Sequence, residues 1–397
     1  MGTCERRCIN RGQQEMGIDD SSWIVGVDAG GSKTVAWLGQ CTPGPSGDMR
    51  IRLQARGTSG PGNPSSRGID AAADSIKNAI DSAICDSATT NESREFASIT
   101  PKFIWIGAAG AARADVSHDL RQIIANHYPS AHVRVSGDVS LLIAAAQASG
   151  SSSETPDWIM RSNTPNGLSP AKTTQEQFRP AFVTGTELAV KIDRKRPVVA
   201  IIAGTGSIVW ANDGNSHENR WGGLGPAIGD VGSGCWLGQQ AIQATMDELD
   251  GRGPKTELVT MLTDHFRILN HRELTDVLRH RNHSPDDLAK LAPMVIDAAR
   301  RDPVAASIVQ SGLKGLAELA RLAADWLGNS HSIVWALGGG VLTENPGMAD
   351  QLLDLVNEDI RRAERVTPTP ATLVIHQPVW GALVAAAFEL ESQRMRR

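Results

Sequence analysis

The chain has 397 residues with a formal net charge of −5, a length that fits about two domains. This charge excludes the strongly basic surface typical of proteins that bind nucleic acid or anionic membranes. Hydrophobic residues make up 41% and charged residues 21%, as in ordinary globular proteins, so a fully disordered chain is excluded. No apolar run reaches the roughly 18 residues of a membrane-spanning helix. Five cysteines without a C-x-x-C pair favour neither a disulfide scaffold nor structural zinc.

The chain opens with a segment that lacks the apolar stretch of a secretory signal. We expect a disordered extension over residues 1–21 and a cytoplasmic protein. Apolar, β-branched runs then predict three strands, two of them joined by a glycine turn. These strands are 23–28, 34–39 and 50–56.

Helical and extended segments alternate after the third strand. Apolar residues recur at helical spacing over 69–85, and further elements follow in the order strand, helix, strand. Asp138 then opens another helix. The pattern predicts an α/β first lobe over 22–148, with the last three elements before Asp138 at 103–109, 116–127 and 132–137.

Residues 149–196 interrupt this order, because they are rich in Ser, Thr and Pro and have few periodic apolar positions. They are typical of a surface insertion or linker. A second lobe is expected over 197–397, with a helical insertion at 239–327 and a final helix, 378–395, able to pack back on the first lobe. Both halves begin with a hairpin that carries a Gly-Ser or Gly-Thr turn, which indicates a duplicated architecture. The strands predicted for the second lobe are 198–204, 207–213, 333–340 and 371–376.

The first turn places an acidic residue at a strand end before glycines, hydroxyls and a lysine. Glycines let backbone N–H groups converge on phosphate oxygens, and Asp28 can hold a hydrated Mg²⁺ beside those phosphates. A plain glycine hairpin with an aspartate at its corner explains the same residues. The segment is no Walker A loop, because a strand follows it instead of a helix. Its candidate phosphate ligands are Gly30, Gly31, Ser32, Lys33 and Thr34.

The second turn, Gly204-Thr205-Gly206-Ser207, again lies between two apolar strands. Alone it indicates a tight hairpin. As a repeat of the first turn it suggests that two such turns face each other and hold one polyphosphate from both sides.

Three further features each have a structural and a functional interpretation. Asp138 follows a strand and precedes a helix, so it can be an N-cap or a base that accepts a hydroxyl proton during phosphoryl transfer. The same choice between cap and ligand applies to Asp230. Glycines at 338–340 end a buried strand, where α/β folds bind ligands or simply turn.

Glycine is in excess, at 39 of 397 residues or about 10% against a usual ~7%. The excess gathers in four segments that we expect to meet the ligands. These segments are 26–31, 204–206, 222–238 and 338–340.

The chain resembles one family in the order of its motifs, over residues 22–147 and 198–392. The motifs are, in chain order, D-x-G-G-S, an aspartate after a strand, G-T-G-S, G-G-x-G-x-x-x-G-D and G-G-G. The chain is similar to the N-acetylglucosamine kinase family, grouped with the BadF/BadG-type ATPases of the actin/hexokinase/Hsp70 superfamily. The resemblance implies a two-lobed actin-like ATPase fold, made of duplicated ribonuclease-H-like domains, with ATP and sugar in the cleft between the lobes.

The resemblance also implies roles by position. Ser32 and Thr205 correspond to ATP-contacting residues, and Asp138 to the catalytic aspartate that also binds the sugar. Gly339, Gly340 and Ala298 fall near the nucleotide. The positions that correspond to sugar contacts are Asn63, Ser207, Ile208, Gly223, Leu224, Gly225 and Asp230.

The implied activity is transfer of the ATP γ-phosphoryl group, with Mg²⁺, to the 6-hydroxyl of N-acetylglucosamine. No nucleic acid or membrane partner is expected, and a homodimer is a candidate assembly because many relatives are dimers. Val231 stands where relatives have Glu, and Leu224 where they often have Trp, so glucosamine or another amino sugar is an alternative acceptor. Two further candidate functions are an activator ATPase with an iron–sulfur cluster, serving 2-hydroxyacyl-CoA dehydratase or benzoyl-CoA reductase, and a sugar sensor without turnover.

Overall fold

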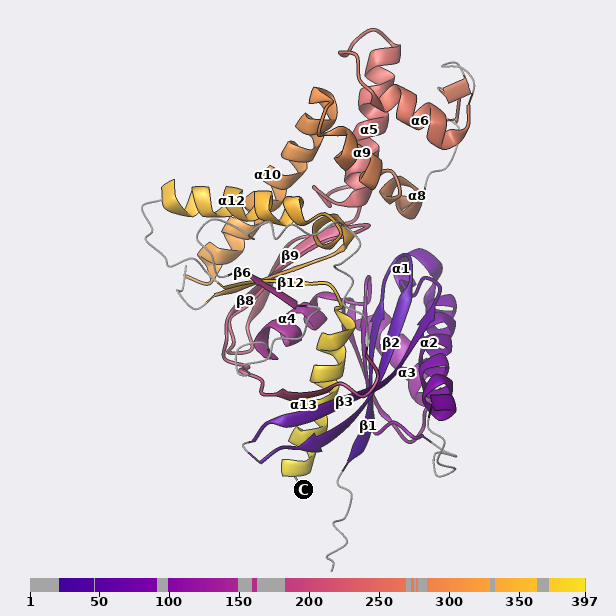
Figure 1. Cartoon of the computed structure of the whole chain (residues 1–397), viewed down its shortest axis with the longest axis vertical. Helices are drawn as coiled ribbons and strands as arrows, with labels where there is room; N and C mark the ends of the chain where they lie inside the picture. Colours follow the sequence, from indigo (N-terminus) through magenta and orange to yellow (C-terminus); the bar gives the residue numbers. More distant parts are fainter. Residues whose placement is uncertain are drawn as a thin grey trace, which may run out of the picture.

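The protein consists of two lobes, each built on a six-stranded sheet (Figure 1). Among the described residues, no helix is long and apolar enough to cross a membrane. The computed structural model describes residues 21–45, 47–90, 99–148, 159–162, 183–268, 273–274, 276–277, 284–328, 333–362 and 371–396.

The first sheet has the strand order β5-β4-β1-β2-β3-β7. Strands β1, β2 and β3 form antiparallel hairpins, whereas β4 and β5 run parallel to β1. Helices α2 and α3 provide the long connections that parallel strands need. The bounds are β1 Ser22–Ala29, β2 Thr34–Pro43, β3 Met49–Ser59, α1 Pro64–Arg67, α2 Ile69–Thr90, β4 Phe103–Ala108, α3 Ala114–His127, β5 His132–Gly137 and α4 Val139–Ala148.

The second sheet repeats this arrangement in the order β10-β9-β8-β11-β12-β6. Here β8, β9 and β10 form the antiparallel meander, and β11 and β12 run parallel to β8. The two sheets confirm the predicted duplicated α/β architecture. The bounds are β8 Val198–Ala203, β9 Ser207–Asn212, β10 Glu218–Gly222, β11 Val334–Gly338, α11 Gly340–Thr343, α12 Pro346–Arg362, β12 Ala371–Ile375 and α13 Val379–Met395.

The segment 149–196, for which the sequence predicts an insertion or linker, contributes strands to both lobes. Strand β6, Ile159–Ser162, pairs antiparallel with β12 at the edge of the second sheet. Strand β7, Glu187–Val190, pairs antiparallel with β3 at the edge of the first. Both strands are four residues long and form because a distant strand supplies their hydrogen bonds. The predicted extension over 1–21 lies, but for its last residue, outside the described residues.

A helical subdomain follows β10 and covers the outer end of the second lobe (Figure 1). It occupies most of the insertion predicted at 239–327. Helix α10 is long and buries a continuous apolar stripe against the sheet. The described helices of this subdomain are α5 Gly234–Leu249, α6 Leu258–Phe266, α8 Pro285–Ala289, α9 Ala292–Ala298 and α10 Pro303–Trp326.

Helices α4 and α13 join the two lobes through one apolar core. The core contains buried residues of both helices and of strands from both sheets. Helix α4 packs mainly on β8 and β11 of the second sheet, although the sequence predicts that residues 22–148 form the first lobe. Helix α13, at the other end of the chain, packs on β1, β2 and β4 of the first sheet (Figure 1). Each lobe is therefore completed by a helix from the other half of the chain.

Glycines make this junction close-packed. Leu141 and Leu142, consecutive residues of α4, lie against Gly107 of the first sheet and Gly338 of the second. The carbonyl of Leu141 also abuts Gly381 of α13, where any Cβ would overlap it. Helix α4 is thus wedged between both sheets and α13, and these glycines serve helix packing.

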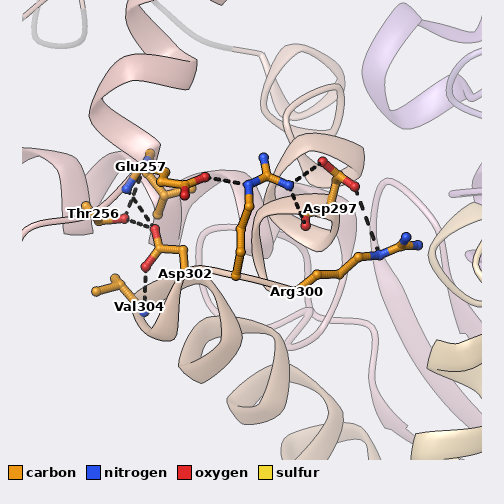
Figure 2. A network of polar contacts seen from close by, with 8 residues as sticks. Thr256, Glu257, Asp297, Arg300, Asp302 and Val304 are labelled. Carbon is orange, nitrogen blue, oxygen red and sulfur yellow. Dashed lines mark hydrogen bonds and ion pairs between the residues drawn. The ribbon is translucent and has the colours of Figure 1, made fainter.

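A polar network fixes the turn between α9 and α10 (Figure 2). Asp302 caps α10 by accepting from Val304 N–H at 2.8 Å, and it also accepts from Glu257 N–H at 2.9 Å and from the Thr256 hydroxyl. Arg301 donates to Glu257 at 2.7 Å and to Asp297 at 3.0 Å. The buried carboxylate of Asp302 is therefore satisfied by three donors that tie α6 to α10.

Replacing Gly381 by alanine is expected to destabilise the protein by about 2 kcal/mol or more, because the added methyl group must push α13 away from α4. Gly347→Ala is the matched control, since nothing lies within 4 Å of a Cβ at that helical position. Urea unfolding measures both variants. Equal midpoints for the two variants would contradict the close packing at Gly381.

Replacing Asp302 by alanine is expected to cost about 2–4 kcal/mol, because the α10 cap is lost and the buried donors of Thr256 and Glu257 are left unsatisfied. The exposed carboxylate of Asp297 provides the control, and Asp297→Ala is expected to change stability little. Thermal and urea unfolding compare the two. A cost for Asp302→Ala no greater than that of the control would show that the network is unimportant.

Candidate functional site

The first glycine turn connects β1 and β2 at one end of the first sheet. Gly30 N–H donates to the Lys33 carbonyl at 2.9 Å, which closes the turn, and the side chains of Ser32 and Lys33 are exposed. The sequence predicts that Thr34 binds phosphate, but its side chain is 0% exposed and its hydroxyl donates to the Gly60 carbonyl at 2.8 Å. Ser32 and Lys33 therefore remain as the side chains able to meet a phosphate.

The second turn connects β8 and β9 and is held by the start of α5. Gly204 N–H donates to the Gly206 carbonyl at 2.9 Å. The first amides of α5, at Gly234 and Cys235, donate to the carbonyls of Gly204 and Thr205 at 2.7 and 3.1 Å. These bonds use the backbone of the turn, and the Thr205 side chain is half-buried.

The two turns lie against each other although they belong to different lobes. A Cβ built on Gly31 would lie 3.3 Å from Thr205 Oγ1. A Cβ built on Gly204 would lie 3.8 Å from the Cα of Gly339, which begins α11 with a φ of +86°. The three glycine segments thus meet at one place between the lobes, as the duplicated turns suggest.

Asp28, near the end of β1, and Asp138, which follows β5, lie close enough for the charge of Asp138 to act on Asp28. Successive side chains of β1 alternate between faces, so Asp28 shares the face of Gly26, which packs on α13. Burial and the nearby charge of Asp138 raise the pKa of Asp28 to about 7, although the positive charge of Lys33 acts to lower it. Burial also raises the pKa of Asp138, although its carboxylate accepts from Val139 N–H at 3.0 Å. Two carboxylates in one poorly solvated place are typical of functional sites.

The donor set of this place fits a magnesium ion that arrives with a nucleotide. In the part of the chain that the structure describes, no three His, Cys, Asp or Glu side chains gather in a group that could hold a metal ion alone. Mg²⁺ keeps several waters and is usually bound through one or two carboxylates plus substrate phosphates. Asp28, beside the first turn, suits such a water-mediated contact.

Asp230 lies beneath the second turn and supports it. It is 7% exposed and has a φ of +59°, an unusual conformation for a non-glycine residue. Its carboxylate accepts from Gly225 N–H at 3.1 Å, and a Cβ on Gly206 would lie 2.7 Å from its Oδ2. Burial raises the pKa of Asp230, and the amides of Gly225 and Ser207 oppose this shift. The side chain therefore fixes two loops as well as bordering the site.

The start of β9 and the loop after β10 contain the remaining predicted sugar contacts. Ser207, at its base, is buried and donates to the Val231 carbonyl at 2.8 Å. Gly223 takes a φ of +64° beneath the side chain of Ile208. At the outside of the loop, Leu224 and Ile228 are 56% and 80% exposed. Predicted contacts in this loop thus divide into internal supports and an exposed apolar tip.

Val231 replaces a glutamate of the resembled family with an apolar contact. A Cβ on Gly315 of α10 would lie 2.5 Å from Val231 Cγ2. The valine therefore packs against the glycine surface of α10, so that the loop is anchored to this helix by apolar contact.

Asn63 and Ala298, both predicted to contact a ligand, lie in different surroundings. Asn63 caps α1 by accepting from Ser65 N–H at 2.8 Å, and it lies against Gly110, whose φ is +82°. This cap uses its side-chain oxygen, and among the described residues its amide nitrogen has no hydrogen-bond partner. Ala298, by contrast, is 0% exposed in the core of the second lobe. The structure thus does not bring Ala298 to the surface where a nucleotide could touch it.

The glycine excess is only partly a property of the site. Glycines 31, 204 and 339 lie where the turns meet, but Gly26, Gly238 and Gly338 accept the backbone of α13, the backbone of α8 and a side chain of α4. The expectation that the four glycine-rich segments approach ligands is therefore corrected for these positions, which allow close helix packing.

Asp286 is a site residue that sequence reasoning misses. A Cβ on Gly31 would lie 2.9 Å from its Oδ1. The S-P-D-D start of its short helix signals an N-cap, which Ser284 provides. Nothing in this local pattern indicates that the helix reaches a turn of the other lobe.

Comparison with known proteins agrees with this architecture. The model of the BadF/BadG/BcrA/BcrD ATPase family matches residues 25–386. A crystal structure from Chromobacterium violaceum, of a protein described as a candidate N-acetylglucosamine kinase, aligns over 91% of this chain and 98% of that one, with a TM-score of 0.56 and 22% identity. A corresponding Porphyromonas gingivalis protein aligns over 92% and 99%, with a TM-score of 0.57 and 16% identity. These neighbours confirm the two-lobed actin-like fold.

Curated relatives match part of the chain. The N-acetylmuramic acid/N-acetylglucosamine kinase of Clostridium acetobutylicum is 25% identical over 199 residues, which are 50% of this chain and 63% of the relative. The N-acetyl-D-glucosamine kinase of Dictyostelium discoideum is 26% identical over 175 residues, 43% and 55% of the two chains. Each match thus spans less than two thirds of the relative's length. The family model covers most of the chain, and the protein belongs to the BadF/BadG/BcrA/BcrD ATPase family.

Proposed function

We propose that the protein is an ATP-dependent kinase that phosphorylates the 6-hydroxyl of an amino sugar, with N-acetylglucosamine as the first candidate. The observation that carries the proposal is the meeting of two glycine turns from different lobes, with Thr205 against Gly31, together with the electrostatically coupled carboxylates of Asp28 and Asp138. The two curated relatives named as N-acetylglucosamine kinases support the class of substrate.

In this proposal the phosphates of ATP lie between the turns. The exposed Ser32 and Lys33 of the first turn and Thr205 of the second donate to the phosphate oxygens. The adenosine lies toward Gly339 and Gly340, where β11 ends. Donors fixed in advance by the fold stabilise the charge of the transferring group without reorganisation.

The sugar lies against the first lobe near Asn63 and Asp138. The Asp138 carboxylate accepts the proton of the 6-hydroxyl while the oxygen of that hydroxyl bonds to the γ-phosphorus and the bond to ADP breaks. Because burial raises the pKa of Asp138, its carboxylate is a stronger base than an exposed aspartate. Asp28 holds a hydrated magnesium ion, which neutralises phosphate charge when bound.

The acceptor is tested by ADP release across N-acetylglucosamine, glucosamine, N-acetylmannosamine and N-acetylmuramic acid. Turnover that requires N-acetylglucosamine supports the proposal, and a preference for another of these sugars reassigns the acceptor. Binding of sugar without ADP release from any of them indicates a sensor. Iron in the purified protein, with ATP hydrolysis independent of sugar, indicates an activator ATPase.

A homodimer and a cytoplasmic location stay predictions. Sedimentation measures the oligomeric state, and cell fractionation measures the location.

Replacing Asp138 by asparagine is expected to lower kcat about 10³-fold, because the amide cannot accept the hydroxyl proton. Mg-ATP affinity is expected to stay within a few fold, since Asp138 meets the acceptor and not the phosphates. Asp119→Asn, at an exposed position of α3, has the same change of charge and serves as the control. A variant that retains most of its kcat would show that another group is the base.

The raised pKa of Asp28 predicts a pH-dependent stability. Between the ordinary carboxyl value near 4 and about 7, the folded state binds more protons than the unfolded state, so the free energy of unfolding falls as pH rises through this window. Asp28→Asn is expected to remove part of this slope and to make the ligand-free protein more stable at pH 8, while weakening Mg-ATP binding.

Urea unfolding at pH 4.5, 6 and 8 measures this slope, again with Asp119→Asn as the control. The same pH dependence in both variants would mean that Asp28 is not strained by burial and the charge of Asp138. The loss of Mg-ATP affinity, measured by calorimetry, is a separate observation that reports on the metal contact.

A further inference from the structure

Helix α8 brings a carboxylate of the second lobe against the phosphate-binding turn proposed for the first. Asp286 lies in the first turn of α8. The same point, a Cβ position on Gly31, is 2.9 Å from Asp286 Oδ1 and 3.3 Å from Thr205 Oγ1. One carboxylate, one hydroxyl and the backbone of a glycine turn therefore converge where the two turns meet.

The position of Asp286 is set by rigid contacts rather than by a free loop. The backbone of α8 at Leu288 abuts Gly238 of α5, and a Cβ on Gly234 would lie 3.2 Å from the Cβ of Ala289. The start of α5 in turn donates hydrogen bonds to the second turn. Helix α8, α5 and the second turn thus pack as one unit that carries both Asp286 and Thr205.

The neighbouring carboxylate has a different role. Asp287 accepts from the Ser284 hydroxyl at 2.7 Å and pairs with Lys290 at 2.8 Å. Among the residues that the structure describes, Asp286 makes no hydrogen bond or ion pair with a side chain. Its charge acts on Lys290, which also experiences the charge of Arg67 at the end of α1. Asp286 is therefore the carboxylate of α8 that is directed toward the opposite lobe and is not engaged within the helix.

A carboxylate that a well-packed helix carries to the meeting of two phosphate-binding turns acts oppositely on two forms of a nucleotide. It repels a metal-free polyphosphate, because like charges a few ångströms apart at a partly buried site interact strongly. It is favourable to a polyphosphate that carries a hydrated divalent cation, because the cation presents positive charge and water donors to the carboxylate.

We propose that Asp286 makes nucleotide binding depend on a divalent cation, so that the site selects Mg-ATP over metal-free ATP. This inference rests on the nucleotide site of the proposed function and adds a specificity-determining residue to it. The proposed nucleotide site then has one carboxylate from each lobe, Asp28 from the first and Asp286 from the second.

Asp286→Asn tests this inference, with Asp287→Asn on the same helix as the control of equal charge. Isothermal titration calorimetry measures the Kd of ATP with excess EDTA and with excess Mg²⁺ for the wild type and both variants. Asp286→Asn is expected to bind metal-free ATP about tenfold more tightly than the wild type and to bind Mg-ATP less tightly. The wild-type ratio of the two Kd values is expected to persist in Asp287→Asn.

An unchanged ratio in Asp286→Asn, or an equal change in both variants, would overturn the role of Asp286 while leaving the nucleotide site intact. Absence of ATP binding to the wild type with and without Mg²⁺ would instead overturn the proposed function. Asp286→Ser removes the same charge with a residue favoured at helix starts, and it supplies the comparison if the asparagine variant does not fold.

Discussion

The contact between α4 and α13 is the constraint on which the two-lobed arrangement depends. Leu141 of α4 touches the first sheet at Gly107 and α13 at Gly381, and the next residue, Leu142, touches the second sheet at Gly338. One apolar core runs through both helices into both sheets. Because close-packed interiors transmit displacement rather than absorb it, the relative position of the lobes follows from this small set of glycine and leucine contacts.

The proposed site is built at the edge of this junction. The same face of β1 carries Gly26 against α13 and, two residues later, Asp28 toward the site. In the second lobe, Gly338 packs on α4, and the next residue, Gly339, meets the second turn. In each lobe, the glycine that packs on a connecting helix is thus only one or two residues away from a residue of the proposed site. A shift of either connecting helix would therefore move the turns relative to each other.

Sequence patterns predict the parts of this structure that local rules determine. Apolar runs and glycine turns identify both hairpins, and the repeat of those hairpins indicates the duplication. The local sequence does not predict strand β6, because its hydrogen bonds come from β12, more than 200 residues away in the chain. Thr34 has the residue type of a phosphate ligand, but a distant carbonyl, that of Gly60, takes its hydroxyl. Asp286 escapes for the same reason, since its position depends on how α8 packs on α5.

The exchange of helices has a consequence for synthesis on the ribosome. The first lobe contains the earliest described strands, with β1 ending at Ala29, yet α13, which covers β1, β2 and β4, begins only at Val379. Domains generally fold from the N-terminal end as the chain emerges, but here the apolar face of the first sheet stays uncovered until α13 has been synthesised. A nascent chain of this protein therefore exposes that face while the residues between β1 and α13 are being synthesised.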